Sequence, residues 1–210
     1  MPNTKENILM TALHLFARDG YEAVSVSMIA GELGITKGAL YKHYSCKHDI
    51  FDCIVERMYE VDRQRSREYG VPEETYGSGP LSYKHVSIDR IQKFTISQFV
   101  FWTEDTFASD FRRMLTLEQY RSAEMAELYQ KCITAGPVEY TEDIFREMIR
   151  EGVLKDEDPK QLAVTFCAPL FLLITISDGK KSKEEYVRLL QRHMEYFFAC
   201  STAQKEQERT

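Results

Sequence analysis

Apolar residues recur every three to four positions in several long segments of this chain. This spacing places apolar side chains along one face of a helix. No stretch alternates apolar and polar residues as a half-buried strand does. The sequence therefore predicts an all-α protein. A first helix is expected over residues 4–19, where the recurring apolar residues are Ile8, Leu9, Ala12, Leu13, Phe16 and Ala17.

The composition is that of a globular protein from a reducing compartment. The 210 residues are 43% hydrophobic and 29% charged, which allows a sizeable core and excludes wholesale disorder. Residues 1–6 lack the basic and apolar regions of a signal peptide, and the most apolar run, 162–176, is shorter than a typical membrane span. The five cysteines form no CxxC pair, which argues against a disulfide framework or a zinc site. We expect a cytoplasmic protein without a metal or a cofactor.

Two short helices joined by a glycine turn are predicted near the N-terminus. Gly20 ends the first helix, and the hydroxyl of Ser25 can cap the second helix, which Gly34 ends. Thr36 then caps a third helix over residues 37–44. This arrangement is typical of a helix-turn-helix motif.

Charge is distributed unevenly along the chain. Residues 1–47 contain five Lys or Arg and four Asp or Glu, whereas the rest contains 22 and 29. A mildly basic head on an acidic body argues against binding to a membrane surface and permits a nucleic-acid contact confined to the head.

The segment around the glycine turn resembles the DNA-binding head of the TetR family of bacterial transcriptional regulators. The resemblance is most specific over residues 34–44, which read Gly-x-Thr-Lys-Gly-x-Leu-Tyr-x-His-Tyr, and it covers about the first 55 residues. The rest of the chain is similar in length and helical content, and in the residues 152–159 that lead into its penultimate helix. The resemblance implies a helix-turn-helix DNA-binding domain over 1–47 and a helical ligand-binding and dimerisation domain over 48–200. A flexible tail, 201–210, is expected to follow.

The residues of the head suit contacts with DNA. Capping hydroxyls at Ser25 and Thr36 can meet phosphates, and Gly38 lets a recognition helix approach closely. Lys37 and Lys42 can reach a phosphate or a guanine edge. Ten residues are therefore predicted to form the DNA-binding site: Ser25, Ser27, Thr36, Lys37, Gly38, Ala39, Tyr41, Lys42, His43 and Lys47.

The resemblance adds particular roles for some of these residues. Tyr41 and His43 match DNA-contacting positions of the family, and Lys47 matches a phosphate anchor at the start of the next helix. Ala39 offers only a methyl group to a thymine, and Ser27 lies where many relatives carry a longer polar or basic side chain. Exposed lysines are usually only solvated, so it is the surrounding motif that favours a function for them.

Other interpretations of nearby residues remain open. Leu40 and Ile29 are expected in the core, and Tyr44 is either a core aromatic or a phosphate ligand. His43 and His48 lie five residues apart without a nearby third ligand, which argues against a metal site.

Large side chains are concentrated between residues 94 and 129. The resemblance implies that a small effector binds inside the helical body, although an aromatic stripe at helical spacing more often forms core. Polar partners for an effector are Gln98, Glu104, Glu118 or Gln119. A pocket lined by these aromatic side chains would bury the apolar surface of its ligand. We therefore expect a flat or largely apolar effector. The predicted pocket residues are Phe94, Gln98, Trp102, Phe107, Phe111, Met114, Tyr129 and Phe166.

The penultimate helix carries apolar residues on several sides, and the last helix carries them on one face. Residues 162–176 include 12 apolar residues, so several sides of this helix need to be covered. The resemblance implies that these two helices form a two-fold interface with a second copy of the chain. The alternative is that 162–176 is the centre of a monomeric core. The residues predicted for the interface are Phe171, Tyr186, Leu190, Met194 and Phe197.

These features together favour a DNA-binding transcriptional regulator over an enzyme. The sequence contains no paired carboxylates near a histidine, no nucleophile motif, no glycine-rich phosphate loop and no zinc signature. The expected function is that of a repressor, which binds a near-palindromic DNA operator as a homodimer and is released by its effector. An activator, or an architectural protein without an effector, is the alternative on the same scaffold.

Overall fold

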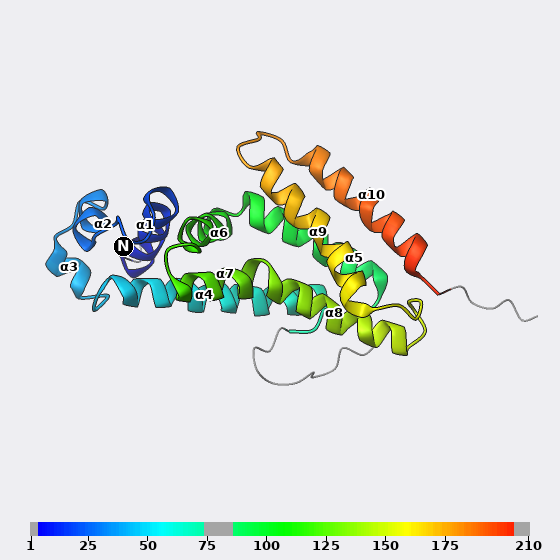
Figure 1. Ribbon diagram of the computed structural model, residues 1–210. Helices are drawn as coiled ribbons and strands as arrows, with labels where there is room; N and C mark the ends of the chain where they lie inside the picture. Colours follow the sequence, from blue (N-terminus) through cyan, green and yellow to red (C-terminus); the bar gives the residue numbers. More distant parts are fainter. Residues whose placement is uncertain (1–3, 74–85, 204–210) are drawn as a thin grey trace, which may run out of the picture. The chain divides into compact units, whose positions relative to one another are not determined.

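The computed structural model describes residues 4–73 and 86–203, and within these ranges the regular elements are helices. The all-α prediction is confirmed. Residues 70–83 are rich in Gly, Pro and Ser and therefore predict a loop, but they lie mostly outside the described residues. The helices, coloured along the chain in Figure 1, are α1 (Thr4–Asp19), α2 (Val26–Glu32), α3 (Lys37–Tyr41), α4 (Lys47–Tyr69), α5 (Ile88–Glu104), α6 (Thr106–Glu118), α7 (Ala123–Ile133), α8 (Ala135–Arg150), α9 (Pro159–Ser177) and α10 (Glu184–Ser201).

The helices form two compact units. The first unit contains residues 1–62 and 104–133, and the second contains residues 63–103 and 134–210. The helix α4 contributes its first part to the first unit and its last residues to the second. These units are defined by packing, so the domain boundary expected between residues 47 and 48 stays a prediction.

The first unit is built on the apolar face of α1. Residues Ile8, Leu13 and Phe16 are fully buried, and α1 packs against both α2 and α6. At the end of α1, Gly20 adopts a φ of 89°, which a residue without a side chain accepts easily. The ring of Tyr21 then packs back on Phe16, with 5.0 Å between the ring centroids.

The turn between α2 and α3 is a Schellman motif. Gly34 has a φ of 64°, and its N–H donates to the carbonyl of Gly31 at 3.0 Å. The N–H of Ile35 donates to the carbonyl of Ala30 at 2.9 Å, which completes the motif. The third helix ends at Tyr41, three residues earlier than predicted, although the N–H of Tyr44 still donates to the carbonyl of Leu40.

An aromatic cluster forms the centre of the second unit. Phe145 of α8 is fully buried and lies 5.4 Å from Phe166 of α9 and 5.6 Å from Phe197 of α10, between ring centroids. Phe198 lies 5.7 Å from Phe166 and 5.2 Å from Phe197. Three helices are therefore held together by side chains far apart in the sequence.

Helix starts in the second unit follow local signals only in part. An aspartate followed by a proline, as at Asp158-Pro159, predicts the cap and the first position of a helix. In the structure Asp158 caps α9 through the N–H groups of Lys160 and Gln161, with Pro159 in the first turn. Ser182 and Glu185 have the spacing of a capping box, which would start the last helix at Ser182. In the structure Lys183 instead occupies the N-cap position of α10 and makes no side-chain cap bond.

The dipeptide Gly136-Pro137 suggests a break between two helices, yet it lies inside the first turn of α8. A proline fits there because the first N–H groups of a helix have no partner within it. The helix break instead lies at Thr134, just before α8.

Part of the predicted flexible tail takes part in pairing. The N–H of Lys155 donates to the carbonyl of Ser201 at 2.9 Å, and the N–H of Ala203 donates to the carbonyl of Val153 at 3.0 Å. Leu154 and Thr202 thereby form an antiparallel bridge. The described end of the chain is thus attached to the segment that precedes α9.

His193 of α10 should make the second unit sensitive to acid. Its ring lies 6.4 Å from Phe166 and 6.3 Å from Phe197, between centroids. Burial lowers the pKa of this imidazole, and a hydrogen bond with the backbone of Phe166 acts in the opposite direction. The unfolded chain therefore takes up this proton at a higher pH than the folded chain does, and stability falls as the pH drops below about 6.5.

We expect His193→Leu to reduce this acid-induced decrease in stability. The measurement is the thermal midpoint at pH 7.5 and pH 5.5, at one protein concentration, for the wild type and the variant. His14→Leu, in the other unit, is the control. An equal drop in midpoint for the wild type and His193→Leu would contradict the assignment.

Candidate nucleic-acid interface

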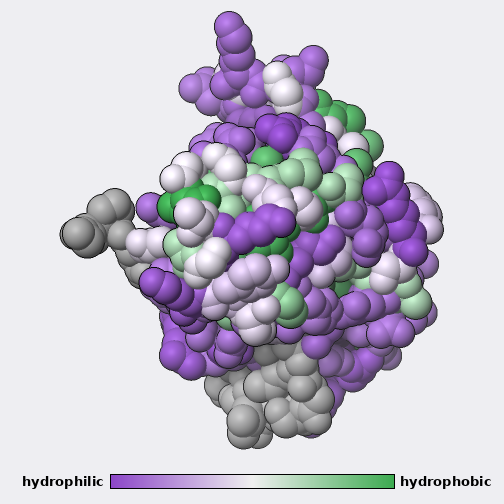
Figure 2. All heavy atoms as spheres, turned by 90° about the vertical axis from the view of Figure 1, so that its left-hand side faces the viewer, coloured by the Kyte–Doolittle hydropathy of each residue, from purple (hydrophilic) through white to green (hydrophobic). Residues whose placement is uncertain are grey.

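Most of the predicted DNA-contacting residues are exposed on and around α2 and α3. Half of the Tyr41 surface is accessible, whereas Ala39 is partly buried. Figure 2 looks at the side on which α2 and α3 lie in Figure 1, and it shows pale and weakly hydrophobic residues among hydrophilic ones. The exposed members of the predicted site are Ser25, Ser27, Thr36, Lys37, Gly38, Tyr41, Lys42 and His43.

Two hydroxyl caps shape this surface. The Ser25 hydroxyl accepts a hydrogen bond from the N–H of Met28 at 3.3 Å, and the Thr36 hydroxyl accepts one from the N–H of Ala39 at 3.1 Å. Each hydroxyl keeps one hydrogen of its own, which it can donate to a phosphate oxygen. The two caps therefore start their helices and remain available as polar contacts.

The surface rests on a packed interior. Leu40 and Ile29 are fully buried, as predicted. Tyr44 is also buried, and its hydroxyl donates to the carbonyl of Lys5 at 3.1 Å. Burial raises the pKa of Tyr44 to about 12, so the phenol remains protonated and keeps donating at neutral pH. These observations favour the core role for Tyr44 over that of a phosphate ligand.

Lys47, at the start of α4, is half-buried and already has partners within the chain. Its ammonium group donates to the carbonyl of Tyr21 at 2.9 Å and lies 4.1 Å from the centroid of the Tyr21 ring. The start of α4 is further fixed by Asp49, whose carboxylate accepts from the N–H of Ser45 at 2.6 Å. That hydrogen bond lowers the pKa of Asp49. The lysine is thus held in a defined direction at the edge of the helix-turn-helix.

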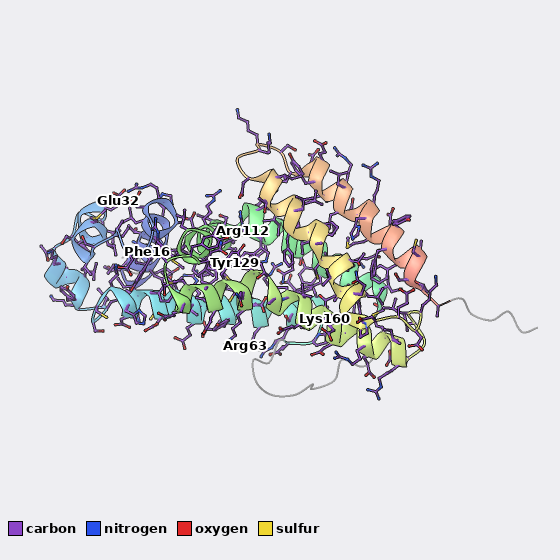
Figure 3. The ribbon with its side chains drawn as sticks, in the orientation of Figure 1. Phe16, Glu32, Arg63, Arg112, Tyr129 and Lys160 are labelled. Atoms are coloured by element: carbon purple, nitrogen blue, oxygen red, sulfur yellow. The ribbon has the colours of Figure 1, made fainter. Side chains whose placement is uncertain are left out.

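The residues predicted for an effector pocket are divided between the two units. Phe107, Phe111, Met114 and Tyr129 belong to the first unit, where Phe111 and Met114 are fully buried and Tyr129 lies on α7 (Figure 3). The guanidinium of Arg57 lies 4.7 Å from the Phe107 ring centroid. These contacts are those of core residues within the first unit.

The other four predicted pocket residues, Phe94, Gln98, Trp102 and Phe166, belong to the second unit. Phe166 is part of the aromatic cluster, whereas Gln98 accepts from Arg65 at 3.4 Å. The same Arg65 donates to Ser97 at 3.0 Å and lies 4.2 Å from the Phe101 ring centroid. Arg65 of α4 therefore contacts two polar residues and one aromatic residue of α5.

Three of the predicted dimer residues face the core of their own chain, which corrects the expectation for them. Leu190, Met194 and Phe197 recur at a spacing of three to four residues and are almost completely buried in the core of the second unit. Phe171 and Tyr186 are only partly buried. The exposed large apolar residues of these helices are instead Val164, Leu172 and Ile176 of α9, and Tyr196 of α10.

The exposed side of α9 has a clear sequence signal. Val164, Ala168, Leu172 and Ile176 lie four residues apart and therefore share one face of the helix. All four are exposed, and 60% of the Leu172 surface is accessible. Among the described residues, α9 is the helix that is long and apolar enough to cross a membrane, with 44% of its apolar window buried. Its uncovered part includes this stripe.

The comparisons with known proteins agree with this geometry. Residues 8–54 match the sequence model of the bacterial regulatory proteins of the tetR family. The HTH-type transcriptional regulator YerO of Bacillus subtilis is 32% identical over 80 residues, which cover 38% of this chain and 27% of YerO. AcrR of Shigella flexneri is 30% identical over 95 residues, 45% of this chain and 43% of AcrR. The aligned region thus spans less than half of these curated relatives.

Solved structures extend the similarity in fold to nearly the whole chain. SmeT, the repressor of the Stenotrophomonas maltophilia multidrug efflux pump SmeDEF, aligns with a TM-score of 0.66 and 20% identity over 98% of this chain and 93% of SmeT. The ketosteroid regulator KstR2 of Mycobacterium tuberculosis aligns with a TM-score of 0.67 and 16% identity over 97% of each chain.

The fold and the exposed α2–α3 surface define a helix-turn-helix protein with a helical body. Its residues 8–54 match the tetR family of bacterial regulatory proteins, and the fold of the whole chain is similar to that of solved regulators of this kind. This is a family of regulatory proteins rather than of enzymes.

Proposed function

We propose that this protein regulates transcription in the cytoplasm by binding a near-palindromic DNA operator as a homodimer. The observation that carries the proposal is the exposed row of Lys37, Tyr41, Lys42 and His43 on and just after α3. A short helix with exposed basic and aromatic residues can enter the major groove, while flanking hydroxyl groups contact phosphates. The match of residues 8–54 to the tetR family supports the same interpretation.

The exposed stripe of α9 supports the dimer. A soluble monomer rarely leaves a contiguous set of large apolar residues uncovered, and such patches usually mark interfaces. A two-fold pairing through α9 and α10 would present two copies of α3, and half-sites one helical turn apart are about 34–36 Å apart. The proposed interface contains Val164, Leu172, Ile176 and Tyr196, together with the partly exposed Phe171 and Tyr186.

A small, largely apolar effector is proposed to release the DNA. Support comes from the aromatic and apolar interior of the helical body, and from a solved complex of SmeT with triclosan, which aligns with a TM-score of 0.68 and 21% identity. In the proposed mechanism the effector favours a state of the body in which α4 misplaces the DNA-binding surface. Coupling of this kind is reciprocal, so saturating operator must weaken effector binding by the same factor.

The contact with phosphate gives a direct test through Lys47. We expect Lys47→Ala to weaken binding to all duplexes by a similar factor, because a phosphate contact carries no sequence information. In a plot of the logarithm of the association constant against the logarithm of the salt concentration, the slope should become less steep by about 0.9 for each phosphate that the protein no longer neutralises. Fluorescence anisotropy with a specific and a scrambled duplex, over a range of salt concentrations, measures both quantities.

Glu56→Ala, an exposed position on the same helix, is the matched control and should leave the salt slope unchanged. A Lys47→Ala protein that binds without selectivity while keeping its general affinity would contradict the anchoring role.

A further inference from the structure

We propose that Glu118, the last residue of α6, is a positioning residue that sets the direction of the Lys47 ammonium for its contact with a phosphate. The inference rests on the proposed DNA-binding function. It concerns residues of the first unit alone, and Tyr21 is the residue that connects Glu118 to Lys47.

Glu118 is a buried carboxylate with two defined partners. Only 1% of its side chain is exposed. Its Oε1 atom accepts a hydrogen bond from the backbone N–H of Tyr21 at 3.0 Å and one from the guanidinium of Arg121 at 3.0 Å. Burial of a carboxylate is unfavourable unless hydrogen bonds or an opposite charge compensate for it, and these two donors do so. The side chain therefore holds the N–H of Tyr21 in place.

The other groups of Tyr21 hold Lys47. The carbonyl of Tyr21 accepts from the Lys47 ammonium at 2.9 Å, and the centroid of its ring lies 4.1 Å from the same nitrogen. The ring also packs on Phe16 and Phe51, with centroid distances of 5.0 and 5.3 Å. A shift of Tyr21 must therefore move the ammonium group or break its two contacts.

The turn before Tyr21 is shaped around the carboxylate. A Cβ atom on Gly20 would lie 2.6 Å from Oε1 of Glu118, and the φ of 89° is one that side chains rarely adopt. A glycine at position 20 therefore allows the chain to approach α6 closely enough for the hydrogen bond between Glu118 and Tyr21.

Lys47 can serve both Tyr21 and DNA. An ammonium group has three N–H donors, and one of them is directed at the Tyr21 carbonyl. The remaining two can bind a phosphate oxygen. Because the long side chain of lysine is flexible, fixing its end before DNA arrives reduces the entropic cost of binding. Glu118 supports this arrangement from α6, a helix that does not itself belong to the helix-turn-helix.

A double-mutant cycle on the full-length protein tests the proposal. The variants are Glu118→Ala, Lys47→Ala and the double variant, each titrated against a specific duplex at several salt concentrations. We expect Glu118→Ala to weaken binding and to lower the salt slope as Lys47→Ala does. The double variant should bind little more weakly than either single variant, because both substitutions remove the same phosphate contact. Glu118→Gln, which keeps an acceptor for the Tyr21 N–H, should restore most of the slope.

Asp110→Ala is the matched control. Asp110 is a second buried carboxylate of α6, but its partners are His14 of α1, at 3.1 Å, and Arg113 of its own helix, at 3.6 Å. Any effect of Asp110→Ala on the free energy of DNA binding should add to that of Lys47→Ala, and the salt slope should stay unchanged. If Glu118→Ala and Lys47→Ala have additive effects on the free energy of DNA binding while the wild type binds selectively, the role of Glu118 is overturned and the proposed function stands. Absence of all selective binding by the wild type would overturn the proposed function and the inference with it.

A measurement on the wild type covers the case in which Glu118→Ala does not fold. Because coupling is reciprocal, a bound phosphate at Lys47 should strengthen the hydrogen bond between Tyr21 and Glu118. We expect hydrogen exchange of the Tyr21 amide to slow when a specific duplex is added. An unchanged Tyr21 exchange rate, with slower exchange elsewhere in the helix-turn-helix, would overturn the proposal.

Discussion

Replacement of Leu172 by Asp is expected to convert the protein from a dimer to a monomer. Leu172 is the most exposed large residue of the α9 stripe, and 60% of its surface is accessible in the single chain. In a two-fold dimer it would be covered, and an uncompensated charge buried there costs about 3–5 kcal/mol. A two-fold interface contains this residue from each subunit, so the substitution places two charges in it. The dimer dissociation constant should therefore rise by at least about 100-fold.

Analytical ultracentrifugation over a range of concentrations measures this change. The matched control is Leu117→Asp, which places the same charge at an exposed leucine of α6, outside the proposed interface. That variant should remain as dimeric as the wild type. A Leu172→Asp protein that dissociates no more readily than Leu117→Asp would show that the α9 stripe does not form the dimer. The monomer should also bind an operator much more weakly, because only one half-site is engaged.

Replacement of Phe145 by Ala is expected to have the largest effect on stability. The ring is fully buried and contacts Phe166 and Phe197, so its removal leaves a cavity between α8, α9 and α10. Truncation of a buried phenylalanine costs about 3–5 kcal/mol. Because the stability of most domains is about 5–15 kcal/mol, the variant should lose a large share of its free energy of unfolding.

Urea denaturation at one protein concentration, followed by circular dichroism, measures the free energy of unfolding. Tyr120→Ala is the control, because 89% of the Tyr120 surface is exposed. Tyr120→Ala should change the free energy of unfolding by no more than about 0.5 kcal/mol. A Phe145→Ala protein as stable as this control would show that the aromatic cluster does not hold the helices together.

The parts of the fold that the sequence predicts best are those fixed by near neighbours. The end of α1 at Gly20, the turn at Gly34 and the cap at Thr36 each depend on residues within five positions, and the structure contains all three. The same holds for Asp158 and Pro159 at the start of α9. Capping and left-handed turns are local chemistry, so a single sequence carries enough information for them.

Predictions that depend on distant packing are less successful. The sequence shows that α10 has an apolar stripe. It does not show whether this stripe packs against the same chain or against a partner. In the structure, Leu190, Met194 and Phe197 face the core of their own chain. Likewise, Glu118 is suggested by its sequence as a polar partner for an effector. It instead accepts from Tyr21, 97 residues away in the chain. Contacts of this kind follow from the path of the backbone, which no local pattern specifies.

Sequence-selective DNA binding through α3 is best tested by selection from a library of random duplexes. The purified protein is used to retain bound duplexes through several rounds at physiological salt, and the enriched pool is sequenced. We predict enrichment of a near-palindromic sequence with two half-sites, and no such enrichment when Lys37, Tyr41 and Lys42 are all replaced by Ala. A pool that stays random with the wild type, or one that is enriched equally by the triple variant, would contradict the claim.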